Sequence, residues 1–160
     1  MAESIDKVLE MMLRNKLYKA YSLAETEGES DPYIRTRVKP KRGSSAFGPV
    51  QITKGKLEDY VTRNLLPEDS AQFARDIVLP MQVEMLKYGG SDMIAGKEHL
   101  DYGQGGGFPV EMRPMLDKLG KDMLMIDYKQ TGGDIDKMIT KWRGKEAEER
   151  YKASIKRYFK

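Results

Sequence analysis

Glu27 is the residue of this sequence best suited to proton-transfer chemistry, because it follows a long apolar helical stripe. Apolar side chains recur at spacings of three and four residues, which predicts one amphipathic helix with a single buried face: Ile5, Val8, Leu9, Met12, Leu13, Leu17, Ala20, Tyr21 and Ala24. At about 100° per residue, Glu27 projects near the mean direction of this stripe, whereas Glu25 and Glu29 project away from it. A carboxyl group against an apolar wall loses hydration, so its pKa rises and it can act as a general acid. The alternative is a solvated glutamate beyond the end of the helix, since helix boundaries inferred from sequence shift by several residues.

Two motifs connect Glu27 to a known family. The first runs from Glu27 to Pro32, and the second is Gly48-Pro49-Val50-Gln51-Ile52. Together they resemble the lysozyme-like lytic transglycosylase superfamily, in which the catalytic Glu ends a helix and a Pro preceded by Asn or Asp follows five residues later. In that family a hairpin then leads to a Gly-x-x-Gln-Ile signature. Thr26-Glu27-Gly28 is also similar to the Ser-Glu-Gly of lambda-type phage endolysins, and the resemblance covers residues 5–60.

The resemblance implies an α+β fold, predominantly α-helical, in which a small β-hairpin sheet lies beside a substrate groove. It implies a single domain over residues 1–160, with Glu27 as the acid and base. Ser45 would hydrogen-bond near Glu27, and Gln51 would fix the substrate or the orientation of the glutamate. Tyr102 and Tyr128 are expected to line the sugar groove. The third family motif departs here, because Tyr102 is followed by Gly103-Gln104 instead of Asn-Ala, which makes Gln104 the candidate substitute for Asn.

The absence of a carboxylate from the predicted hairpin bears on mechanism. Ordinary glycosidases use two carboxyl groups that flank the scissile bond, but residues 33–52 contain no Asp or Glu. The resemblance therefore favours a lytic transglycosylase, which cleaves the MurNAc–GlcNAc bond of peptidoglycan with one Glu and forms 1,6-anhydro-MurNAc. Asp101 could instead enter the cleft and support a hydrolytic lysozyme. No metal or cofactor is implied, because the chemistry needs only proton transfer and charge stabilisation.

Residues 33–52 are also basic, which allows another class of function. Their five cations are Arg35, Arg37, Lys39, Lys41 and Arg42. Such a segment suits either nucleic-acid phosphates or an acidic cell-wall polymer. Its position directly after Glu27 favours the wall polymer, and aromatic residues for base stacking are sparse. The rival hypothesis is a non-catalytic basic virion or nucleic-acid-binding protein.

Composition sets the remaining limits. The chain has 160 residues and a net charge of +3, which suits one globular domain. It has no cysteine and one histidine, His99, so thiol chemistry is excluded and a Ser-His-Asp triad is disfavoured. No apolar run approaches the ~18 residues of a membrane span, and the N-terminus is not a signal peptide. We expect a monomeric phage enzyme that acts on peptidoglycan glycan strands, held in the host cytoplasm until holin-mediated release or packaged in the virion.

The rest of the sequence predicts the elements that must position these residues. Residues 33–45 resemble a hairpin around a Pro/Gly turn. A helix should begin near Pro67 and end or kink at Pro80, with a continuation to Gly89-Gly90. Three further helices are predicted at 110–126, at 135–142 and at the C-terminus, where Tyr151, Ile155, Tyr158 and Phe159 share a face.

Overall fold

The structure is a computed structural model, and it describes residues 2–25, 46, 48–87, 109–144 and 149–159. Its helices follow one another along the chain as α1 (Ala2–Glu25), α2 (Lys54–Thr62), α3 (Glu68–Phe73), the π-helix η1 (Ala74–Val78), α4 (Leu79–Lys87), the 3-10 helix η3 (Val110–Met112), α6 (Arg113–Gln130), α7 (Ile135–Arg143) and α8 (Glu149–Phe159). None of these helices is long and apolar enough to cross a membrane.

The predicted α+β class is wrong for the part of the chain that the structure describes, which is helical and contains no strand. The hairpin expected at residues 33–45 lies outside the described residues. The segment that follows it, Gly48–Ile52, is a turn whose φ angles are positive at Gly48 (82°) and Gln51 (54°). These left-handed conformations interrupt an extended backbone. Val50 and Ile52 are buried by packing against helices.

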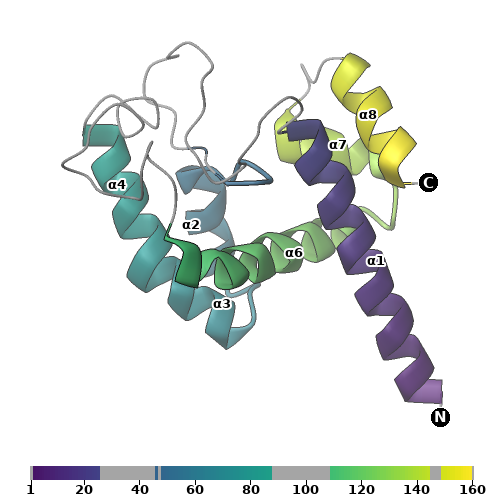
Figure 1. Ribbon diagram of the computed structural model, residues 1–160, viewed down its shortest axis with the longest axis horizontal. Helices are drawn as coiled ribbons and strands as arrows, with labels where there is room; N and C mark the ends of the chain where they lie inside the picture. Colours follow the sequence, from purple (N-terminus) through teal and green to yellow (C-terminus); the bar gives the residue numbers. More distant parts are fainter. Residues whose placement is uncertain (1, 26–45, 47, 88–108, 145–148, 160) are drawn as a thin grey trace.

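Helix α6 runs through the middle of the molecule, with α2, α3 and α4 at one end and α7 and α8 at the other (Figure 1). Helix α1 crosses α6 and packs against both α6 and α8. The inner face of α6 supplies fully buried side chains such as Leu119 and Met123, and the second half of α1 adds Leu17 and Tyr21. The core therefore follows α6: α1, α7 and α8 enclose it at one end, and α2, α3 and η1 add Leu57, Phe73 and Val78 at the other.

The apolar stripe of α1 is not buried along its whole length, as the sequence pattern had predicted. Leu17 and Tyr21 are fully buried, but Ile5, Val8, Leu9, Met11 and Met12 are 55–62% exposed. The reason is geometric. Each four-residue step advances about 40° around an α-helix, so the steps Leu9–Leu13–Leu17–Tyr21 wind the stripe around α1. This winding turns the buried face of the C-terminal half away from the mean direction of the stripe. The N-terminal half is exposed because it projects beyond the other helices (Figure 1), so that every residue from 5 to 12 is exposed whichever way it points.

Gly120 permits the close contact between α6 and its neighbours. A Cβ atom at this position would lie 2.9 Å from the Tyr18 ring of α1 and 3.1 Å from a Val50 methyl group. Both distances are shorter than normal carbon contacts. A residue without a side chain here therefore lets α1 and the Gly48–Ile52 turn reach the same point on α6.

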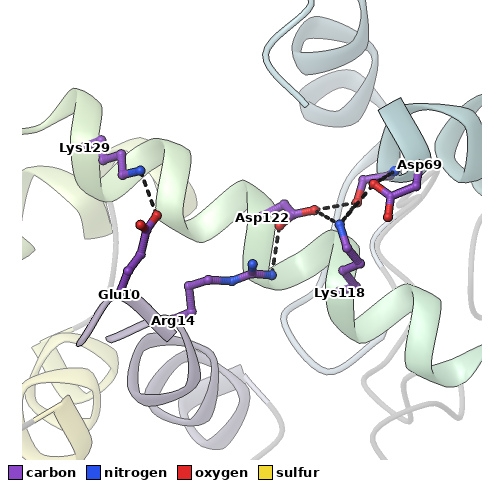
Figure 2. Close-up of polar contacts among 7 residues, drawn as sticks. Glu10, Arg14, Asp69, Lys118, Asp122 and Lys129 are labelled. Carbon is purple, nitrogen blue, oxygen red and sulfur yellow. Dashed lines mark hydrogen bonds and ion pairs between the residues drawn. The ribbon is translucent and has the colours of Figure 1, made fainter. Parts of the chain in front are cut away.

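A polar cluster fastens α1 and α3 to α6 (Figure 2). The Asp122 carboxylate of α6 is nearly buried, and its two oxygens lie 2.8 Å from Arg14 Nη2 and 2.8 Å from Lys118 Nζ. Ser70 donates its hydroxyl to the same carboxylate over 2.5 Å, and Lys118 also reaches Asp69 of α3 at 3.1 Å. The ion pairs and hydrogen bonds together compensate for burying the charge.

Pro80 lies inside a continuous helical stretch instead of ending it. Helices α3, η1 and α4 follow one another without a break from Glu68 to Lys87. A proline removes one helical hydrogen bond and clashes with the carbonyl four residues earlier. The π-helical segment Ala74–Val78 includes that carbonyl, at Asp76, and its wider turn accommodates the ring.

Candidate active site

Three consecutive residues of α7 each hold a different part of the molecule. Lys141 forms an ion pair with Asp127 of α6. Trp142 donates a hydrogen bond to the Gly48–Ile52 turn, and Arg143 donates one to Glu25 at the C-terminal end of α1. Helix α7 begins with an N-cap at Asp134, whose side chain accepts a hydrogen bond from the Lys137 backbone N–H. A short capped helix thus contacts both the C-terminal end of α1 and the Gly48–Ile52 turn, which carries the second motif.

Glu25 is held by two other helices. Arg143 Nη1 lies 2.7 Å from Glu25 Oε2, and the Tyr151 hydroxyl of α8 donates to Glu25 Oε1 over 2.7 Å. The Glu25 side chain is only 5% exposed. Burial raises the pKa of Glu25, while the Arg143 charge and the hydrogen bonds from Tyr151 and Arg143 oppose that rise. Both carboxylate oxygens are already occupied, so this group is suited to holding α7 and α8 against α1.

The Gly48–Ile52 turn is fixed from several directions. Gln51 donates its side-chain amide to the Gly48 carbonyl over 2.9 Å, which closes the turn on itself. Trp142 Nε1 donates to the Val50 carbonyl at 3.1 Å, and Gln82 of α4 donates to the Ile52 carbonyl at 3.0 Å. Backbone groups that a loop would otherwise leave unpaired are therefore bonded. The turn that carries Gln51 has a defined position relative to α4 and α7.

A buried ion pair lies beneath the same part of α7. Asp127 is fully buried, 3.1 Å from Lys56 Nζ of α2 and 3.4 Å from Lys141 Nζ. Burial raises the pKa of Asp127 and lowers that of Lys56, and the mutual attraction opposes both shifts. The Lys56 ammonium also lies 4.4 Å from the centre of the Trp142 ring. The Lys56 ammonium over the ring and the hydrogen bond to the Val50 carbonyl together orient Trp142.

Of the site residues predicted from the sequence, only Gln51 and Tyr128 lie among the described residues. Glu27, Ser45, Tyr102 and Gln104 fall outside them. Gln51 belongs to the fixed turn. Tyr128 is half-buried on α6, and its ring centre lies 6.5 Å from that of Phe159 on α8. Tyr128 and Gln51 thus contact different elements, and their expected roles at a sugar groove remain predictions.

Sequence reasoning missed Glu25, Arg143 and Tyr151 as a group. Glu25 was expected to point away from the apolar stripe, and its side chain is instead nearly buried. The winding of the stripe explains the difference, because the buried face near residue 25 is rotated relative to the mean direction of the stripe. The Trp142-Arg143-Gly144 run was the available signal, since a Trp and an Arg beside a helix end favour a docking contact.

Comparison with protein-family models, curated proteins and solved structures finds no match for this chain. Within the described ranges, no group of His, Cys, Asp and Glu side chains is arranged to hold a metal ion.

Proposed function

We propose that this protein cleaves the β-1,4 bond between MurNAc and GlcNAc in peptidoglycan as a lytic transglycosylase, with Glu27 as its acid and base. The observation that supports this most is the bridge made by α7. Trp142 donates a hydrogen bond to the Gly48–Ile52 turn, and the adjacent Arg143 donates one to Glu25. Glu25 precedes Glu27 by two positions in the sequence. The segment that leads to the candidate acid and the segment that carries Gln51 share one anchor.

The reaction needs one carboxyl group in two protonation states. Glu27 first gives its proton to the glycosidic oxygen as the bond to the anomeric carbon breaks. The resulting carboxylate then takes a proton from the 6-hydroxyl of the same muramic acid, whose oxygen bonds to the anomeric carbon. Glu27 is protonated again, no water is consumed, and the product ends in a 1,6-anhydro sugar.

Gln51 fits the role of a rigid polar group beside the reacting sugar. Its positive φ and its hydrogen bond to Gly48 fix both its backbone and its side chain. Preorganised polar groups stabilise a transition state without reorganising during the reaction. The amide oxygen of Gln51 remains available to accept a hydrogen bond from a sugar hydroxyl or from the protonated acid.

Glu25 and Glu27 form a matched pair for testing this assignment. Glu25→Gln keeps the shape of a group whose oxygens already accept hydrogen bonds from Tyr151 and Arg143. Glu27→Gln removes the proposed proton donor. We expect Glu27→Gln to abolish clearing of purified peptidoglycan, and Glu25→Gln to retain clearing at temperatures where it is folded. Clearing by Glu27→Gln at the wild-type rate would refute the assignment.

Product analysis separates the proposal from its alternatives. Mass spectrometry of digested wall should find 1,6-anhydro ends, whereas reducing ends alone would indicate a hydrolytic lysozyme. Tight, salt-sensitive binding to DNA without any digestion of the wall would indicate the non-catalytic rival instead.

A further inference from the structure

A cleft of about 420 Å³ lies between α1 and the N-terminal half of α6, and the proposed reaction does not use it. On each helix the lining residues follow the three- and four-residue spacing of a single face. They are Met11, Arg14 and Asn15 of α1, and Pro114, Asp117, Lys118 and Lys121 of α6. The volume is within the range of roughly 300–1,000 Å³ that is typical of small-molecule sites.

The side chains that line the cleft carry more positive than negative charge. Arg14, Lys118 and Lys121 are cations, whereas Asp117 is the one carboxylate among them. Arg14 and Lys118 meet at the buried Asp122 carboxylate, each at 2.8 Å, as Figure 2 shows. Lys121 differs from both, because its ammonium group forms no ion pair with any residue that the structure describes. The charge of Lys121 is therefore available to a ligand.

An aromatic ring holds Lys121 in place. The Lys121 ammonium lies 5.5 Å from the centre of the Tyr18 ring, within the range of a cation–π attraction. The Tyr18 hydroxyl donates to Asp117 Oδ1 over 2.5 Å, and the same ring packs closely on Gly120. Because the ring is fixed, the ammonium group is placed before a ligand arrives. Such preorganisation lowers the entropy that binding would cost.

Two residues of α1 add hydrogen-bond donors to the cleft. Arg14 reaches Asp122 through Nη2, and its side chain remains 27% exposed. A guanidinium group carries five N–H donors, so donors remain for a ligand. Asn15 is exposed, and its amide forms no hydrogen bond with a residue in the described ranges. The ammonium, guanidinium and amide groups together are complementary to an oxyanion.

The other lining residues indicate which oxyanion. Met11 and Pro114 are apolar and offer a surface for hydrocarbon groups. The negative charge of Asp117 disfavours a doubly charged phosphate more than a singly charged carboxylate. A water molecule occupies about 30 Å³, so the cleft holds a ligand of roughly ten to fifteen non-hydrogen atoms. This is the size of a dipeptide with an acetyl cap.

We infer that this cleft binds a small organic carboxylate of dipeptide size. Its carboxylate lies between Lys121 and Arg14, where the Asn15 amide also donates to it. Its hydrocarbon groups contact Met11 and Pro114. This inference is independent of the proposed enzymatic function, because the cleft can be tested by binding alone.

NMR titration of the ¹⁵N-labelled full-length protein with N-acetyl-alanyl-alanine tests the site. We expect saturable shifts of the backbone amides in residues 11–15 and 114–121. The same peptide ending in a carboxamide keeps the methyl groups but lacks the charge. It should bind about tenfold more weakly, because the charge-assisted hydrogen bonds are lost. Inorganic phosphate, which has no hydrocarbon part, should also bind more weakly than the peptide.

Lys121→Gln tests the role of the ammonium group. It breaks no ion pair with a described residue, so the urea midpoint should stay unchanged. We expect about tenfold weaker binding of the peptide, whereas Lys121→Arg keeps the charge and should bind well. Lys16→Gln is the matched control and should bind like wild type. Lys16 also lies over an aromatic ring, 5.2 Å from the centre of Phe159, but does not line the cleft.

Each contrary result would overturn the inference. The absence of saturable shifts at tens of millimolar peptide would exclude the site. Equal binding of the carboxamide, or unchanged binding by Lys121→Gln, would show that no carboxylate is recognised there. Tighter binding of phosphate than of the peptide would contradict the choice of an organic carboxylate. Saturable shifts confined to other helices would place the binding elsewhere.

Discussion

The indole nitrogen of Trp142 donates a hydrogen bond to the Val50 carbonyl over 3.1 Å. This single contact fixes the distance between α7 and the Gly48–Ile52 turn. Trp142 is the only tryptophan of the sequence. The Tyr21 ring packs against it nearly perpendicularly, at a centre-to-centre distance of 6.0 Å. The contact thus joins the buried face of α1, the turn and α7 at one point.

Replacing Trp142 by Phe should therefore destabilise the protein. Phenylalanine keeps an aromatic ring beside Lys56 but cannot donate to the Val50 carbonyl, whose hydrogen-bonding capacity is then unmet. We expect a loss of about 1–3 kcal/mol in the free energy of unfolding. Urea denaturation followed by circular dichroism measures it. Tyr158→Phe, on the exposed side of α8, is the control and should change little. An unchanged midpoint for Trp142→Phe would show that the hydrogen bond contributes nothing.

Glu25 should make stability depend on pH in a defined direction. Burial raises the pKa of Glu25 above its ordinary value of 4.5 in the folded state. The folded protein therefore binds this proton more tightly than the unfolded chain. The stabilisation that this tighter proton binding gives the folded state is complete below pH 4.5. It is lost as the pH rises through the raised pKa of Glu25 in the folded state. Glu25→Gln cannot titrate, so we expect its free energy of unfolding to increase relative to wild type as the pH rises above 4.5.

Urea midpoints of both proteins, measured between acidic and neutral pH, test this difference. Asp127 also has a raised pKa, but it titrates in both proteins and cancels in the comparison. If wild type instead gains stability over Glu25→Gln as the pH rises, Arg143 and Tyr151 outweigh the cost of burial.

Gly48→Ala should strain the turn that carries Gln51. Gly48 has φ of 82°, which is unfavourable for alanine, and an added Cβ would lie 3.2 Å from Leu116. We expect a destabilisation of roughly 1–3 kcal/mol from the backbone strain alone. Gly55→Ala is the matched control, because nothing lies within 4 Å of its added Cβ and it stands within α2. Thermal unfolding of both variants distinguishes them; equal stability would show that the turn adjusts without cost.

Much of the helical structure could be predicted from the sequence because it depends on local spacing. The apolar pattern at Leu116, Leu119 and Met123 gave the buried face of α6, and the predicted helices at 135–142 and at the C-terminus are confirmed as α7 and α8. These elements bury residues that lie three or four positions apart on one helix. Periodicity alone is sufficient for such elements.

The partners of Glu25 could not be predicted in this way, because they are distant in the chain. Arg143 and Tyr151 follow Glu25 by 118 and 126 residues. Their contact depends on how α7 and α8 pack against α1, which no local pattern encodes. The left-handed conformation of Gln51 is hidden for a similar reason. Glutamine has no preference for positive φ, so the surrounding hydrogen bonds must impose it.

The Asp122 carboxylate compensates two cations, Arg14 and Lys118. Asp122→Leu would leave Arg14 and Lys118 without their shared partner. Removing one member of a buried ion pair costs about 3–5 kcal/mol, and we expect the lower end because Lys118 retains Asp69 at 3.1 Å. Glu10→Gln weakens only the surface pair with Lys129 and should have no measurable effect. Chemical denaturation of the two variants makes the comparison. If Asp122→Leu loses no more free energy of unfolding than Glu10→Gln, burying the Asp122 charge costs as much as its ion pairs and hydrogen bonds contribute.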